Sequence, residues 1–346
     1  MYRILHLFRD EKFTMNFIKF INNNFKMDYH EIWVYGRHIA YTETNIFNMK
    51  NVKRVVDISS KLKMIKLNEF DKIIYHGVFD DDIISFFATN KKFLNKLYLY
   101  FWGGDKFLSQ NKMENLKKKY VVRNAHGIIN ILPEERKYMI KNYKVKGTLF
   151  CAMYSGDFEL LKTIKNEKIN NKECVRIQIG NSATKSNNHI DILQKLSRFK
   201  DESIQIYVPL SYGNMNYAKR VIKEGRRLFG DKFFPMTELI SYEKFKQFSN
   251  TIDIGIFDMK RQQALGNIIT LIYYGKKVFL RNKSVLFHYF KIFKNCDIFT
   301  TEEIPGMEYE KFIEFPETCK LNNGKKVEDI LRVEPRIDEW TKIFYD

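Results

Sequence analysis

The first half of the chain alternates between short apolar runs and longer segments with helical spacing. The apolar runs are rich in β-branched and aromatic residues and end in glycine or polar residues, which is typical of buried strands. They cover residues 2–8, 30–36, 63–68, 71–79, 96–104 and 125–132. Apolar residues spaced three and four apart predict helices at residues 13–25, 81–96 and 133–143. This alternation indicates a parallel α/β sheet.

A second series of the same kind begins after residue 170. Strands are predicted at residues 174–180, 203–213, 232–236, 252–258 and 277–281. Helices are predicted between them at residues 187–199, 216–229, 241–251 and 263–275. Two further helical patterns, at residues 327–334 and 339–345, lie near the end of the chain.

The length and the two series together predict two α/β domains. A chain of 346 residues exceeds the size at which a single hydrophobic core usually stops growing. We therefore expect two Rossmann-like domains that face a cleft, and a helical tail. The expected boundaries are 1–155, 156–325 and 326–346.

The composition is that of a globular protein with a strong positive charge. Hydrophobic residues make up 45% of the chain, which excludes a disordered protein. The 59 basic and 41 acidic residues give a formal charge of +18, which favours an anionic partner such as nucleic acid, acidic lipid or a phosphorylated substrate. A general enrichment in Lys and Asn on solvated surfaces is the alternative explanation.

The cysteines and the apolar runs bear on the cellular compartment. Four cysteines occur without a CxxC pair, so neither a zinc site nor a disulfide framework is indicated, and a reducing cytosol is expected. The first apolar run is short and soon meets charged residues, so no signal peptide is expected. No window reaches the roughly 18 apolar residues of a membrane-spanning helix, so we expect no membrane span.

The polar segment from Gly180 to Asn188 separates a predicted strand from a predicted helix. Ligands of open α/β sheets bind at the carboxyl ends of strands, and a helix N-terminus attracts anions. Glycine allows a phosphate to approach the backbone, while Asn181, Ser182 and Ser186 add neutral donors and Lys185 adds charge. The alternative is an ordinary N-capped loop, since Ser and Asn are common caps.

A second polar segment opens the helix after the strand at residues 252–258. Arg261, Gln262 and Gln263 lie where this helix begins, and Gly266 allows close packing in its first turns. Arginine binds phosphate through two N–H groups, and amides can bond sugar hydroxyls. The alternative is a polar helix start with a solvated arginine.

Two motifs in the first half also end strands. His76 could act as a base near neutral pH, and Asp105 could act as a base or bind a hydroxyl beside Trp102. A histidine after a strand is, however, often a structural residue. The carboxylates at residues 80–82 could bind a metal or could simply favour a helix N-terminus.

Several of these motifs, taken together, resemble one known family. The pieces are "YHGVF" at 75–79, "FWGGDKF" at 101–107, "IGNSATKSNNHI" at 179–190, "YVPLSYG" at 207–213 and "RQQALGNI" at 261–268. In this order and spacing they resemble the bacterial TDP-N-acetylfucosamine:lipid II N-acetylfucosaminyltransferases, the 4-alpha-L-fucosyltransferase family. The chain departs from the family pattern at Gly104, Ala183 and Thr184.

The resemblance implies a fold, a reaction and partners. The fold would be that of a GT-B glycosyltransferase, with an inverting reaction and no cofactor or obligatory metal. The donor would be a deoxy-amino sugar on thymidine diphosphate. The acceptor would be a glycan on undecaprenyl diphosphate, so we expect a peripheral protein at the anionic cytoplasmic face of the bacterial inner membrane. Lysines and aromatic residues at 91–102 and 115–123 would form the patch that meets this membrane.

Each candidate residue takes a role under this resemblance. Asp105 is the first choice for the base that deprotonates the acceptor, and His76 is the second. Glu238 would hold the ribose of the nucleotide, and Tyr212 would stack or bond nearby. The remaining donor-binding residues would be Gly180, Asn181, Ser182, Lys185, Ser186, Asn187, Arg261, Gln262, Gln263 and Gly266.

Three alternatives stay open at this level. The enzyme could use a UDP- or GDP-linked sugar in O-antigen or capsule assembly. A non-catalytic GT-B scaffold would keep the nucleotide loop but would tolerate loss of Asp105 and His76. A nucleic-acid-binding protein would explain the positive charge, but the chain carries no RRM signature or helix-turn-helix pattern.

Overall fold

A computed structural model describes residues 2–11, 14–36, 42, 44–109, 111–167 and 173–346. The chain forms two compact units, and each is described by itself. The first unit contains residues 1–156 and 332–346, and the second contains residues 157–331. The expected three-part division differs from this one at the C-terminus, where the last residues belong to the first unit.

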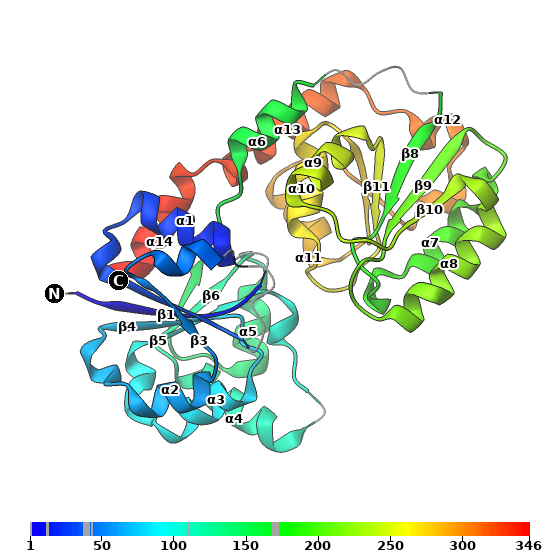
Figure 1. The fold of residues 1–346 in the computed structure, drawn as a ribbon. Helices are drawn as coiled ribbons and strands as arrows, with labels where there is room; N and C mark the ends of the chain where they lie inside the picture. The colour runs from blue at the N-terminus through cyan, green and yellow to red at the C-terminus, as the bar shows by residue number, and fades with distance from the viewer. Residues whose placement is uncertain (1, 12–13, 37–41, 43, 110, 168–172) are drawn as a thin grey trace. The chain divides into compact units, whose positions relative to one another are not determined.

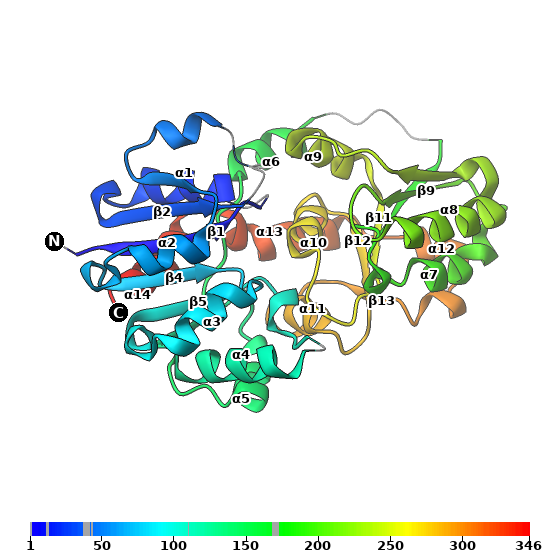
Figure 2. The ribbon, with the colours of Figure 1, turned by 60° about the horizontal axis from the view of Figure 1, so that its bottom comes forward.

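The first unit is built on a parallel sheet whose described strands number seven. Figure 2 shows β2, β1, β4 and β5 side by side in this order. In spatial order the strands are β3 (Val52–Val55), β2 (His30–Tyr35), β1 (Ile4–Arg9), β4 (Lys72–His76), β5 (Leu97–Phe101), β6 (Gly127–Asn130) and β7 (Thr148–Cys151). The inner strands are buried on both faces, which explains their nearly continuous apolar sequences.

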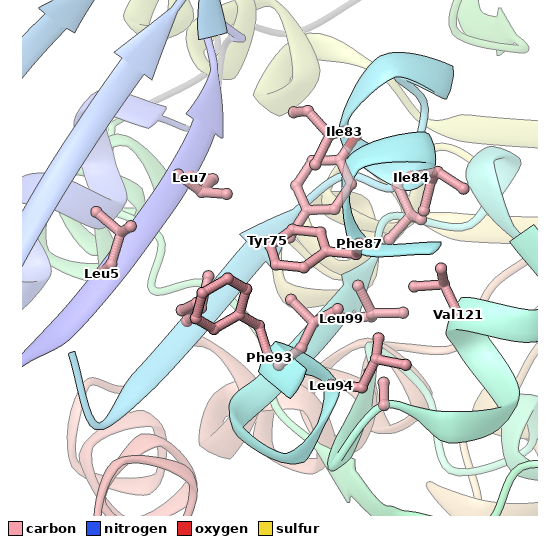
Figure 3. Packing of buried hydrophobic residues seen from close by; sticks show 14 of the residues in the cluster. Leu5, Leu7, Tyr75, Ile83, Ile84, Phe87, Phe93, Leu94, Leu99 and Val121 are labelled. Atoms are coloured by element: carbon pink, nitrogen blue, oxygen red, sulfur yellow. The ribbon is translucent and has the colours of Figure 1, made fainter. Parts of the chain in front are cut away.

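Helices cover both faces of this sheet. Figure 1 shows α1 and α14 on one face and α2, α3 and α4 on the other. The helices are α1 (Thr14–Asn24), α2 (Ile58–Met64), α3 (Asp81–Thr89), α4 (Lys112–Asn124), α5 (Glu135–Tyr143) and α14 (Glu334–Phe344). Figure 3 shows Ile83 and Phe87 of α3 packed over Tyr75 and Leu99 of the sheet.

The C-terminal helix α14 is an integral part of the first unit. Its residues Trp340, Ile343 and Phe344 belong to the core on the face that also holds α1. The Trp340 indole donates to the backbone oxygen of Met153 at 3.0 Å, and Lys72 Nζ donates to that of Ile343 at 2.8 Å. These contacts explain why the tail does not form a separate part.

The second unit has a parallel sheet of six described strands. In spatial order they are β10 (Phe233–Met236), β9 (Ile204–Pro209), β8 (Val175–Ile179), β11 (Ile254–Phe257), β12 (Lys277–Leu280) and β13 (Phe299–Thr300). Figure 1 shows α7 and α8 on one side of this sheet and α9, α10 and α11 on the other. The helices are α6 (Phe158–Lys165), α7 (His189–Leu196), α8 (Met215–Phe229), α9 (Tyr242–Thr251), α10 (Leu265–Tyr273), α11 (Val285–Phe287), α12 (Tyr309–Ile313) and α13 (Glu317–Leu331).

One predicted strand is wrong. Residues 63–68 were expected to form a strand, but they span the end of α2 and a 3₁₀ turn at Leu67–Glu69. Met64 is exposed, and Leu67 is the buried residue of this segment. The third strand of the sheet is instead β3, a short edge strand whose two central residues are exposed. A four-residue edge strand carries too few buried positions to be recognised by its pattern.

Candidate functional site

Three neighbouring strands in the second sheet bring together the polar segments predicted as a site. β9, β8 and β11 are adjacent and parallel, so the segments that follow them leave the same edge of the sheet. These segments are residues 180–188, 210–214 and 258–264. Ala183 and Gly213 form a parallel bridge between the first two segments. Residues far apart in the sequence therefore meet at one edge.

Gly180 makes the turn that ends β8. Its backbone has φ +65°, in the left-handed region that favours glycine. A Cβ atom at this position would lie 2.6 Å from His189 Nε2 and 2.8 Å from Asn187 Oδ1. The glycine was predicted to let a phosphate approach the backbone, and the structure shows that it also admits these two side chains.

Asn187 braces the loop from inside. Its side chain is fully buried, and its Oδ1 accepts a hydrogen bond from the backbone N–H of Asn181 at 3.2 Å. Its Nδ2 donates to the backbone oxygens of Ser182 at 3.0 Å and Thr184 at 3.2 Å. These contacts hold the loop in one conformation, so Asn187 acts on the loop backbone rather than at its surface.

Gln263 connects this loop to the segment after β11. Its Nε2 donates to Asn181 Oδ1 at 2.9 Å, and its Oε1 accepts from Ser186 Oγ at 2.8 Å and from Arg261 Nε at 3.1 Å. Asn181 Nδ2 in turn donates to the Tyr212 hydroxyl at 3.0 Å. Five of the predicted residues, which we call the amide network, thus form one hydrogen-bonded group.

The amide network offers donors to a ligand. The bond to Gln263 uses one of the five N–H groups of the Arg261 guanidinium. Tyr212 is 39% exposed, and Lys185 is exposed on the loop that follows β8. An arginine, a lysine and several neutral donors at the edge of a parallel sheet are suited to a diphosphate.

The other predicted residues of the second unit lie outside the amide network. Ser182 is buried, with its hydroxyl 3.0 Å from that of Thr184. Gln262 is buried, and its Oε1 has no partner among the described residues. Glu238 is exposed between β10 and α9, and Gly266 is exposed within α10.

Asp258 is a central residue of this edge that the sequence analysis missed. It is buried directly after β11, and its Oδ2 accepts from Asn188 Nδ2 at 2.6 Å and lies 3.1 Å from Arg281. Its Oδ1 accepts from the Thr301 hydroxyl at 2.6 Å. Asp258 thereby fixes Asn188, the residue that precedes α7. Its position at the end of a strand was the only signal in the sequence.

His189 begins α7 beneath the loop. Burial lowers the pKa of its imidazole to about 4, so the ring is neutral near pH 7. Neither ring nitrogen has a partner among the described residues, and Nε2 faces Gly180.

In the first unit, Asp105 is enclosed by the backbone of two loops, its own loop after β5 and the loop after β4. The side chain is 2% exposed and accepts hydrogen bonds from the N–H groups of Val78 at 2.9 Å, Trp102 at 3.0 Å and Gly103 at 2.8 Å. Burial raises the pKa of this carboxyl. The carboxylate joins the segments after β4 and β5, and Lys118 Nζ joins them again by donating to the backbone oxygens of Val78 and Asp105.

His76 belongs to a buried chain of polar rings. His30 Nδ1 lies 2.9 Å from His6 Nε2, and His6 Nδ1 lies 3.1 Å from His76 Nε2. His76 Nδ1 is 2.8 Å from the Tyr154 hydroxyl, which also accepts from the Trp102 indole at 2.8 Å. Burial lowers the pKa of all three histidines, to about 4 for His30. We call these five residues the histidine chain.

Asp80 is the more accessible carboxylate at this edge of the first sheet. Its side chain is 28% exposed, and its Oδ2 accepts from the hydroxyls of Tyr35 at 2.7 Å and Tyr75 at 3.3 Å. Arg9, at the end of β1, lies 3.7 Å from its Oδ1. Among the described residues, no group of three or more His, Cys, Asp or Glu side chains is arranged to hold a metal ion.

A family comparison matches most of the chain. The family described as 4-alpha-L-fucosyltransferase glycosyl transferase group 56 matches residues 35–305. This range contains the amide network and also Asp80, His76 and Asp105.

Solved structures match the chain over nearly its whole length. A glycosyltransferase from Rickettsia africae has a TM-score of 0.73 and 13% identity, with 99% of this chain and 97% of that chain covered. HepE from Anabaena, in complex with UDP and glucose, has a TM-score of 0.72 and 11% identity, with 100% of both chains covered. The α,α-trehalose 6-phosphate synthase from Burkholderia multivorans has a TM-score of 0.71 and 8% identity, with 100% and 98% covered.

The fold class is therefore confirmed. The chain is an α/β protein with two Rossmann-like domains, of the kind found in GT-B glycosyltransferases. In the described part of the chain, no helix combines the length and the apolar character needed to cross a membrane.

Proposed function

We propose that this glycosyltransferase uses a TDP-linked deoxy-amino sugar as its donor. The premise is that the chain belongs to the 4-alpha-L-fucosyltransferase family of glycosyl transferase group 56. The sugar would be of the N-acetylfucosamine type, and the acceptor a glycan on undecaprenyl diphosphate. The product would enter a surface polysaccharide such as enterobacterial common antigen.

The amide network carries this proposal. It joins the segments after three strands in the second unit and presents Arg261 beside neutral amides and hydroxyls. A nucleoside diphosphate leaves with one more negative charge than it carries as the sugar ester, and fixed N–H donors stabilise this charge as it develops. Asn181, Ser186 and Gln263 would be held ready for this task because they already bond one another.

Transfer also needs a proton acceptor for the incoming hydroxyl. In an inverting reaction, the acceptor oxygen bonds to the anomeric carbon as the bond from that carbon to the diphosphate breaks. The hydroxyl proton passes to a base, and the nucleoside diphosphate leaves. Asp105 and His76, the predicted bases, are enclosed in the first unit. We therefore assign proton uptake to Asp80, and we give Asp105 the role of holding the loop that carries Trp102.

The nucleotide and the acceptor lipid are the finer parts of the proposal. The structure of HepE contains UDP, which keeps a UDP-linked donor as the main alternative, beside a GDP-linked one. The formal charge of +18 supports an anionic membrane surface as the place where a lipid-linked acceptor is met. A non-catalytic scaffold would keep the amide network but would not need Asp80.

Calorimetric titration with TDP, UDP, GDP and a short DNA duplex tests the donor site. We expect selective binding of TDP, weakened at least about tenfold by Gln263→Ala, which removes the side chain that joins Asn181, Ser186 and Arg261, and about tenfold by Arg261→Ala, which removes a charged donor. Gln194→Ala, an amide removed from an exposed position on α7, is the matched control and should bind as the wild type does. Equal affinity for all three nucleotides, or binding to DNA alone, would contradict the proposal.

A further inference from the structure

Helix α4 carries an apolar stripe on its exposed side. Met113, Leu116 and Tyr120 are spaced three and four residues apart, so they lie on one face of the helix. They are 61%, 62% and 38% exposed, whereas Val121 and Val122 on the other side of the same helix are fully buried. Packing in the core accounts for the two apolar valines. It does not account for the apolar residues of the stripe, because most of their surface is exposed to water.

Phe107 and Leu108 are two further exposed apolar residues, close in sequence to the start of α4. They follow the short turn Gly104–Lys106 after β5, and both are exposed by more than a third of their surface. They therefore belong to the segment that contains Trp102 and Asp105. Exposed apolar residues therefore occur both in the segment after β5 and on α4, which lies next to α3 (Figure 1).

Basic residues surround this apolar surface. Lys112, Lys119 and Arg123 are exposed on α4, and Lys91 and Lys92 are exposed at the start of the 3₁₀ segment Lys91–Lys96. Lys91 Nζ lies 5.3 Å from the centre of the Tyr120 ring, so the cationic and apolar groups are in contact. The one acidic residue of α4, Glu114, is paired with Lys117 at 2.9 Å.

We infer that α4 and residues 107–108 form a surface that docks on an anionic lipid bilayer. Apolar side chains would enter the boundary between headgroups and acyl chains, while the lysines would meet the lipid phosphates. The charge favours lipid over a second copy of this chain, because two copies of so basic a surface would repel one another. The inference rests on the proposed function in one respect: a lipid-linked acceptor gives the enzyme a reason to bind a bilayer.

The proposed docking surface contains fewer residues than the membrane patch predicted from the sequence. Residues 97–101, part of the predicted patch, form the buried strand β5. Helix α8, in contrast, presents Lys219, Arg220, Lys223 and Arg226 as exposed basic residues. Its large exposed apolar residue is Met215 at the first position, so α8 is a cationic helix without a comparable stripe.

Co-sedimentation with vesicles tests the inference. We expect the wild type to bind vesicles of phosphatidylcholine mixed with phosphatidylglycerol and to bind vesicles of phosphatidylcholine alone weakly. Met113→Glu with Leu116→Glu should lower binding to the mixed vesicles at least about tenfold, since two insertions are lost and two repulsive charges added. The matched control is Met64→Glu, an 81% exposed methionine on α2 of the same unit.

The outcomes separate the alternatives. Unchanged binding of the Met113 and Leu116 double variant to the mixed vesicles would overturn the inference. It would also be overturned if the Lys219→Ala, Lys223→Ala double variant of α8 lost vesicle binding while the Met113 and Leu116 double variant kept it. Conversion of a wild-type dimer to a monomer by the double variant, measured by sedimentation velocity, would assign the surface to self-association and also overturn it. Nucleotide titration of the double variant should match the wild type, so failure of the donor proposal and failure of the docking inference would be told apart.

Discussion

The two sheets end in edges of the same kind but treat their polar groups differently. In the first unit, Asp105 and the three histidines of the histidine chain are almost fully buried and are bonded to backbone or to one another. In the second unit, the amide network is bonded together as well, but its members Tyr212 and Arg261 are exposed or partly exposed, and Lys185 is exposed beside them.

The difference shows that polar residues at a strand end serve two purposes. A buried carboxylate that accepts three backbone N–H groups stabilises a loop, because those groups would otherwise lose their hydrogen bonds away from water. A network with charged groups at its surface can hold an outside anion. At the first edge the buried polar groups therefore stabilise the loops, whereas the second edge is a candidate binding surface.

Acidification should distinguish the units most strongly. The first unit holds three buried histidines with lowered pKa values, and the second holds His189. Below pH 6.5 the unfolded chain binds protons that the folded protein does not, so the free energy of unfolding falls as the pH falls toward about 4. At pH 5 we expect a loss of about 2 kcal/mol from His189 in the second unit, and a larger loss from the three histidines of the first unit.

Hydrogen exchange at pH 7 and pH 5, corrected for the intrinsic pH dependence of exchange, measures the loss of stability separately in each unit. The core strands β1 and β4 should lose more protection than β8 and β11. His288→Gln changes an exposed histidine and should leave the profile as it is. Equal losses in the two units would show that the buried histidines do not account for acid sensitivity.

Asp105→Ala and Asp80→Asn should separate stability from activity. Removal of the Asp105 carboxylate leaves three buried N–H groups without an acceptor, so we expect a loss of about 4 kcal/mol. The melting temperature should then fall by about 10 °C. Asp80→Asn should lower the transfer rate about 100-fold or more, because an amide cannot take up the proton. Its melting temperature should stay close to that of the wild type.

Thermal unfolding and a transfer assay with the donor identified by titration measure both quantities. Asp82→Ala changes an exposed carboxylate on the same helix as a control. A stable Asp105→Ala protein with no activity would return the catalytic role to Asp105, as the sequence analysis predicted. Full activity in Asp80→Asn would remove Asp80 from the mechanism.

Alanine substitutions at two glycines of the second unit should have small and opposite effects on stability. Gly180→Ala places a Cβ atom against His189 and Asn187 in a left-handed conformation, so we expect a loss of about 2 kcal/mol and weaker nucleotide binding. Gly266→Ala meets nothing within 4 Å and lies in a helix, so we expect a gain of about 0.5–1 kcal/mol. Urea unfolding and nucleotide titration measure these effects. Weaker binding by Gly266→Ala would place Gly266 in the donor site, as predicted from the sequence.

The order of strands and helices was predictable for a physical reason. The strands β8, β9, β11 and β12 are short apolar runs separated by amphipathic helices, and the structure confirms each of them. The prediction failed at residues 63–68, where a short helix and an edge strand have too few buried positions to show a period.

The candidate site was predictable in position but not in detail. A polar segment after a strand lies at the carboxyl edge of a parallel sheet, so the segments at 180–188 and 261–263 could be expected to meet. The role of Asp258 could not be expected, because its partners Asn188, Arg281 and Thr301 lie 70, 23 and 43 residues away in the sequence.

By itself, the sequence determined the α/β class, the two halves and the strand ends where polar residues gather, because these follow from local periodicity and turn chemistry. The tertiary structure alone decided which polar residues face inward. His6 and His76 are 70 residues apart and bond only because β1 and β4 pair, and Asp105 is enclosed only because two loops meet around it. Burial and long-range pairing are properties of the folded chain, so no local pattern could show that these two candidate bases are enclosed.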